Sequence, residues 1–117
     1  MPGAPEPLHH LFEMLSTLEG ADERTRFLLR VHIGNHSLFL SGAFAPTIRS
    51  RAEERGFPDL KYYERLGRTH YRVASDHQLA QRYEVADILS TLSERFVTTR
   101  RALNDIAERS FFLGDPS

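Results

Sequence analysis

Residues 26–42 read RFLLRVHIGNHSLFLSG, and the architecture of the chain follows from them. At 100° per residue around a helix, their apolar side chains fall into three sectors instead of one. The sectors hold Phe27, Val31 and Leu38; Leu28 and Phe39; and Leu29, Ile33 and Leu40. The consistently polar strip is narrow and consists of Arg26, Arg30, Ser37 and Ser41. A helix that is apolar on most of its circumference is covered by neighbours on most sides, so the stretch predicts a central helix.

The composition is that of one ordinary globular domain of 117 residues, with 40% apolar and 26% charged residues. The 15 basic and 16 acidic residues give a net charge of -1, so no global field favours nucleic acid or anionic lipid. Lys61 is the single lysine, and this preference for arginine is typical of GC-rich, bacterial-type coding sequences. Cysteine is absent, which excludes disulfides, thiolate catalysis and cysteine-ligated metal centres.

The N-terminal residues lack a basic region followed by an apolar run, so they do not resemble a signal peptide. No apolar stretch reaches the roughly 18 residues that a membrane helix needs. We therefore expect a soluble protein in the cytoplasm, with no membrane partner.

The periodicity and the capping residues predict an all-α fold, a five-helix bundle between residues 8 and 113. A flexible lead-in, residues 1–7, precedes it, and a frayed tail, residues 114–117, follows it. Apolar residues three and four apart indicate a first helix, which Gly20 ends. Asp22 is a suitable N-cap for the central helix, which should end near Ser41.

Pro46 fits the first turn of a short third helix, and Gly56 closes it. Asp59 caps a fourth helix that contains Gly67, where the close approach of another helix is expected. Ser75 opens a capping box for the fifth helix.

This fifth helix is predicted to be long, because no proline or glycine occurs between residue 75 and Gly114. About 35 residues would span roughly 50 Å, more than the diameter of so small a domain. Either the helix bends near Tyr83, or its far end packs on another copy of the chain. We favour a homodimer, joined through a near-heptad seam of Leu89, Leu92, Phe96, Leu103 and Ile106.

Three histidines, His32, His36 and His70, lie on faces that are otherwise apolar. Together with Tyr63 they are the candidate residues of an interior ligand-binding pocket. The alternative is that they are hydrogen-bonded core residues, because a buried polar group without a partner costs about 1–3 kcal/mol. A structural role predicts that His32→Ala lowers the melting temperature.

The same three histidines are candidate ligands for Fe or Zn, or for a haem, because side chains four residues apart project to one side of a helix. The sequence has no His-Glu-x-x-His motif, and its one Glu-x-x-His lies in the predicted lead-in. No catalytic motif is present either, so the chain is more consistent with binding than with catalysis.

A basic stripe, made of Lys61, Arg65, Arg68 and Arg72, lies opposite the apolar face of the fourth helix. Such a stripe can contact phosphates, but it is more often a solvated face that pairs with nearby acids such as Glu64.

Residues 60–67, LKYYERLG, are similar to the LRYYExxG string that follows the helix-turn-helix of MerR-type transcription regulators. Residues 47–56 are also similar to that family's first helix and turn. The resemblance covers about 20 residues, and it implies a DNA-binding regulator. The chain departs from the family at Arg51 and Arg55, where the motif needs apolar residues, and in the short gap before Leu60. Nucleic acid is therefore the least favoured partner.

These patterns predict a small helical binding module with a regulatory or scaffolding role as a homodimer. A metal- or haem-binding helical protein is the first alternative, and a DNA-binding regulator is the second.

Overall fold

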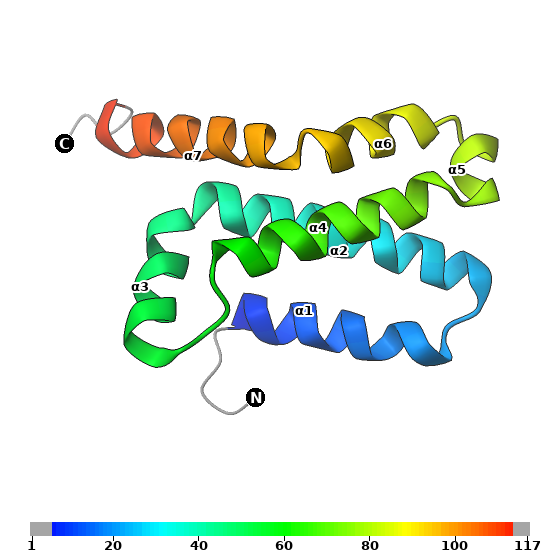
Figure 1. The fold of residues 1–117 in the computed structure, drawn as a ribbon, viewed down its shortest axis with the longest axis horizontal. Helices are drawn as coiled ribbons and strands as arrows, with labels where there is room; N and C mark the ends of the chain where they lie inside the picture. The colour runs from blue at the N-terminus through cyan, green and yellow to red at the C-terminus, as the bar shows by residue number, and fades with distance from the viewer. Residues whose placement is uncertain (1–5, 114–117) are drawn as a thin grey trace.

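The computed structural model describes the backbone of residues 6–113 and the side chains of residues 7–110. The described residues form seven α-helices and one short 3-10 helix, and they contain no strand, so the prediction of an all-α fold is confirmed (Figure 1). The elements are α1 (Glu6–Thr17), η1 (Leu18–Gly20), α2 (Glu23–Ala43), α3 (Ala45–Arg55), α4 (Leu60–Ser75), α5 (Gln78–Arg82), α6 (Ala86–Glu94) and α7 (Phe96–Leu113).

The predicted lead-in and tail fall largely outside the described residues, which exclude 1–5 and 114–117. Glu6 and Pro7, which the sequence placed in the lead-in, already belong to α1. None of the described helices is long and apolar enough to cross a lipid bilayer.

Capping contacts confirm three predicted boundaries, the starts of α2 and α4 and the end of α3, whereas the first helix ends at Thr17 and not at Gly20, because the chain continues there as η1. The Asp22 carboxylate accepts a hydrogen bond from the Thr25 backbone N–H at 2.8 Å, and Asp59 does the same for Tyr62 at 3.0 Å. Gly56 ends α3 with a φ of 66°, the left-handed conformation that glycine adopts without strain. Local chemistry therefore set these three boundaries.

The prediction of a single long fifth helix is wrong, and with it the count of five. The chain forms α5, α6 and α7 instead, and Glu84 breaks it with a φ of 58°. The bend near Tyr83, which the sequence offered as the alternative to the favoured dimer, is present, because α5 reverses the chain so that α6 returns along α4 (Figure 1). Packing explains the break. The same apolar cluster is contacted by Leu79 of α5, by Val85 and by Leu92 of α6, and a single straight helix could not bring all three side chains to it.

The capping box at Ser75 is also wrong. Ser75 is the last residue of α4 and is buried, and its hydroxyl donates to the Arg72 carbonyl at 2.7 Å. The cap of α5 is His77, whose ring Nδ1 accepts from the Leu79 N–H at 3.0 Å.

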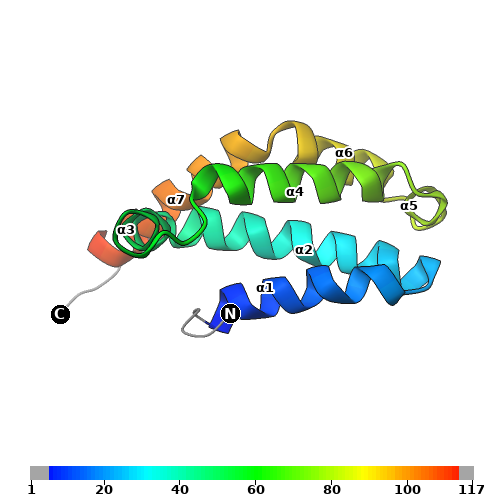
Figure 2. The same cartoon turned by 60° about the horizontal axis from the view of Figure 1, so that its bottom comes forward.

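Helix α2 lies at the centre of the fold, with α1 on one side and α4 and α7 on others (Figure 2). Two apolar clusters fill the space around it. One lies between α1, α2 and the first half of α4, and the other between α2, α4 and the helices from α5 onward. The prediction of a central helix is confirmed, but three neighbours leave one strip of α2 uncovered. This strip contains Leu28, His32, Asn35 and Phe39, and the Phe39 side chain is 55% exposed.

Gly67 allows the close approach that the sequence predicted. A Cβ at this position would overlap the ring of Phe96, a fully buried residue at the start of α7. The missing side chain therefore determines how closely α4 meets the turn between α6 and α7.

Candidate functional site

The four residues of the predicted pocket do not come together. His32 and His36 line an open groove between α1 and α2, and Tyr63 lines a separate cavity. His70 lies on α4 and contacts Arg30 of α2. The expectation that His32 points into the core is wrong, because its side chain is exposed on the uncovered strip of α2. The physical reason is that α1, α4 and α7 pack on the other sides of α2 and leave the side that carries His32 exposed to solvent.

His36 is half-buried at the edge of this groove. Its Nε2 lies 3.1 Å from the Pro7 carbonyl, and its ring meets the His10 ring edge-on at 5.4 Å. Burial lowers the pKa of His36, so the neutral ring that donates to Pro7 is favoured. The candidate metal ligands His32, His36 and His70 are not gathered, and residues 7–110 contain no cluster of three or more histidines or carboxylates suited to a metal ion.

His70 has the structural role that the sequence offered as an alternative. It is 8% exposed, and the Arg30 guanidinium donates a hydrogen bond to its Nδ1 at 3.1 Å. Burial, with the Arg30 charge as a second cause, lowers the pKa of His70 to about 4. The ring is therefore neutral in the native protein.

We predict that His70 makes the stability of the fold fall in mild acid. Its pKa is about 4 in the folded chain and about 6.5 when exposed, so the native state binds fewer protons than the unfolded state. The contribution is complete above about pH 6.5 and is lost as the pH falls towards 4, on the order of 3 kcal/mol in all. Denaturant unfolding at several pH values measures it.

His70→Gln should flatten this pH dependence, because the amide oxygen can still accept from Arg30 but does not titrate in this range. His32→Gln is the matched control, and we expect it to leave both the pH dependence and the melting temperature unchanged. The sequence-based expectation that loss of His32 lowers the melting temperature thus no longer applies. An unaltered pH dependence in His70→Gln would contradict the assignment.

An apolar cavity lies among the end of α2, helix α3, the starts of α1 and α4, and the α3–α4 loop. Its volume is about 370 Å³. Its lining residues are Pro7, Leu8, Leu40, Phe44, Thr47, Ile48, Arg51, Phe57, Pro58 and Tyr63. We refer to it as the α3 cavity. Its walls are mainly apolar, which fits it for a hydrophobic molecule or part of one.

Two polar groups of the α3 cavity can orient a ligand. Tyr63 is buried, and burial, followed by the influence of Tyr62, raises its pKa to about 12. Its hydroxyl therefore stays protonated at neutral pH and is available as a donor. Arg51 lines the same cavity, and its charge acts on the pKa of Tyr63 in the opposite, lowering sense. Both groups favour an anionic partner.

Sequence reasoning found Tyr63 but missed the rest of the α3 cavity. Its lining comes from four helices and a loop, and each contributes apolar residues that resemble ordinary core. The one sequence signal was Arg51, a charged residue one helical turn from the buried Ile48 on α3.

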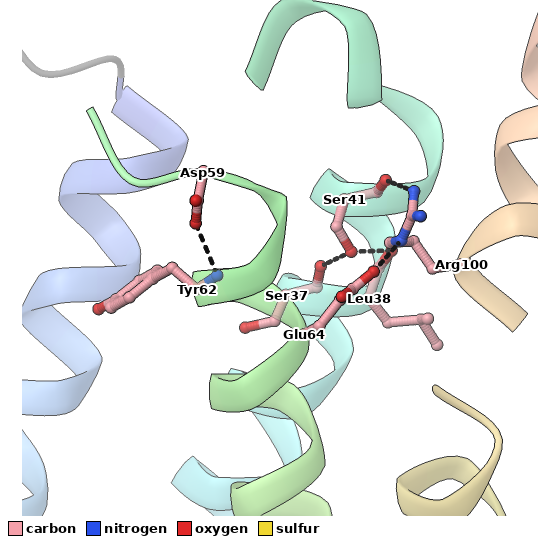
Figure 3. A network of polar contacts seen from close by, with 7 residues as sticks. All are labelled: Ser37, Leu38, Ser41, Asp59, Tyr62, Glu64 and Arg100. Atoms are coloured by element: carbon pink, nitrogen blue, oxygen red, sulfur yellow. Dashed lines mark hydrogen bonds and ion pairs between the residues drawn. The ribbon is translucent and has the colours of Figure 1, made fainter. Parts of the chain in front are cut away.

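A polar network joins α2, α4 and α7 (Figure 3). The Arg100 Nε of α7 donates to the Glu64 carboxylate of α4 at 2.8 Å, and its Nη1 donates to the Ser41 carbonyl of α2 at 3.3 Å. The Ser41 hydroxyl donates in turn to the Ser37 carbonyl at 2.6 Å. This network fixes α2, α4 and α7 relative to one another.

The predicted dimer seam is used mainly within the chain. Leu89 and Phe96 belong to the second apolar cluster, and Leu92 packs against it. Leu103 is half-buried and would meet a Cβ placed at Gly42. Of the five seam residues, Ile106 is left 59% exposed. Apolar periodicity in α6 and α7 therefore reflects their packing on α2 and α4.

The stripe of basic residues on α4 is exposed as expected, but its predicted partner Glu64 pairs with Arg100 instead. Residues 56–59 join α3 directly to α4, so the similarity to MerR-type regulators does not extend to a recognition helix.

Comparisons with protein-family models, with curated proteins and with solved structures found no match. The functional argument is therefore based on the geometry of the chain itself.

Proposed function

We propose that this chain is a small helical binding module and that the α3 cavity holds its ligand. The ligand is a small, mainly apolar molecule with one acidic group. The observation that carries this proposal is the combination of apolar walls with a single cation, Arg51, and a protonated donor, Tyr63.

The size and the polarity of the cavity support this class of ligand. A volume of about 370 Å³ lies at the small end of the roughly 300–1,000 Å³ range of ligand pockets. Arg51 is exposed and forms no ion pair with another residue of the described chain, so its charge is available to a carboxylate. The apolar walls contribute affinity, and the two polar groups select the orientation.

Titration with octanoate and with 1-octanol tests the proposal, because the two probes share an alkyl chain and differ in the acidic head. We expect saturable NMR shift changes confined to residues around the α3 cavity, with octanoate the tighter probe. Arg51→Gln should weaken octanoate about five- to tenfold and octanol less than about twofold, since a partly exposed charge-assisted hydrogen bond is lost.

Arg49→Gln is the matched control. Arg49 is also exposed on α3 and has the same charge, but it does not line the cavity. Equal effects of the two variants, or shift changes elsewhere on the protein, would overturn the proposal.

The other roles inferred from the sequence stay predictions. The first is a homodimer, for which the outer half of α7 around Ile106 is the remaining exposed seam. The others are a metal or haem held by histidines, a DNA-binding regulator, and a cytoplasmic location. Native mass spectrometry of untagged protein measures the first two together, because it reports subunit number and bound cofactors.

A further inference from the structure

A second, smaller cavity lies on α4 where this helix meets α6, and it is independent of the α3 cavity. Its volume is about 140 Å³, and it is lined by Arg65, Arg68, Thr69, Arg72 and Ser93. We refer to it as the arginine pocket. The first four residues lie on one face of α4, because their spacing of three, four and seven residues returns to the same side of a helix.

The arginine pocket concentrates positive charge without an acidic partner. No carboxylate lines it, and no ion pair joins Arg65, Arg68 or Arg72 to an acid within residues 7–110. Glu64, the nearest acid along the chain, is held by Arg100. The three guanidinium groups can therefore offer their N–H donors to an anion from outside.

This arrangement has an energetic cost that a bound anion would remove. Like charges three and four residues apart on a helix repel one another and destabilise it. Arg65 with Arg68, and Arg68 with Arg72, are two such pairs. An anion between them turns this repulsion into a set of charge-assisted hydrogen bonds.

The wall of the pocket is held in place by its neighbours. The Ser93 hydroxyl donates to the Arg68 carbonyl at 2.8 Å and so ties α6 to α4 at this point. One turn from Ser93, Phe96 packs against Gly67 of α4. The arginines thus project from a surface that both contacts keep rigid.

We propose that the arginine pocket binds the phosphoryl group of a phosphate monoester. Such a group carries close to two negative charges at neutral pH, and arginine matches its oxygens with paired donors. A single group is favoured over a nucleic-acid backbone for two reasons. The cavity is small, and Lys61, which extends the stripe along α4, does not line it.

Phenyl phosphate at low ionic strength is the probe, and NMR shift changes or calorimetry give its affinity. We expect one saturable site at the arginine pocket and a rise in melting temperature on binding. Arg68→Gln should weaken binding about tenfold, and Arg72→Gln should act in the same direction. Both side chains are exposed, so circular dichroism should show an unchanged fold.

Lys61→Gln is the matched control, because it removes one positive charge from the same stripe but not from the pocket. It should weaken phenyl phosphate less than about twofold. Affinity for phenyl phosphate should also rise between about pH 5.5 and 7, as the second phosphate ionisation near pH 6 is completed. Benzenesulfonate, a monoanion throughout this range, should bind more weakly and without that rise.

Two results would overturn the proposal. One is an equal loss of phenyl phosphate binding in Lys61→Gln and Arg68→Gln. The other is a short DNA duplex that binds more tightly than phenyl phosphate and depends on Lys61 as strongly as on Arg68, which would indicate an extended phosphate-tracking surface instead of a pocket.

Discussion

Arg100→Met is expected to lower the free energy of unfolding by about 3 kcal/mol, because it leaves the Glu64 carboxylate without its partner in a largely buried position. The two side chains are 5% and 18% exposed, and they meet at 2.8 Å. The substitution also removes the hydrogen bond from Arg100 to the Ser41 carbonyl. Urea unfolding followed by circular dichroism measures the loss.

Arg109→Met provides the matched control for Arg100. Arg109 lies on the same helix, and its Nε lies 3.2 Å from the Asp105 carboxylate, but both side chains are exposed. Exposed ion pairs contribute little, so we expect a change within about 0.5 kcal/mol. The double variant Glu64→Gln/Arg100→Met should recover part of the stability lost in Arg100→Met, because no unpaired charge remains. A loss in Arg100→Met no larger than in Arg109→Met would contradict the assignment of a structural ion pair.

Phe96→Ala is expected to lower the free energy of unfolding by about 3–5 kcal/mol, the usual cost of deleting a fully buried aromatic ring. Gly67→Ala should also destabilise, by about 2 kcal/mol, because the new Cβ overlaps the Phe96 ring. The higher helix propensity of alanine, worth about 1 kcal/mol, opposes this loss and is included in that value.

The double variant Gly67→Ala/Phe96→Ala distinguishes direct contact from two independent defects. With the ring removed, the Cβ introduced at position 67 enters vacated space, so the double variant should be more stable than the sum of the single changes by at least about 1 kcal/mol. Gly20→Ala is the control, because nothing lies within 4 Å of a Cβ at Gly20. Strict additivity of the two single changes would show that Gly67 and Phe96 do not set the spacing of these helices.

The helices that the sequence predicted correctly are those with local signals. Asp22, Gly56 and Asp59 act through hydrogen bonds or backbone conformations that involve residues within about four positions. The all-round apolar character of α2 likewise predicted a central helix without knowledge of its neighbours. The glycine at position 67 predicted a close approach, but not that Phe96 would be its partner.

The environment of each face of α2 depends on tertiary packing. His32 and His36 lie in sectors that the sequence could not distinguish from the buried ones, since apolar residues flank both. The number and positions of the covering helices left His32 in solvent, while His70 on α4 became buried beside Arg30.

Capping and periodicity act over one or two turns, so the amino-acid sequence was sufficient for the helical class, the starts of α2 and α4, the end of α3 and the central place of α2. The break of the C-terminal segment at Glu84, the α3 cavity and the arginine pocket required the packed structure. The physical reason is that these features depend on side chains from helices far apart in the chain. Their contacts exist only once α1 and α4 have packed on the central helix, α3 on α2 and α4, and α6 on α4.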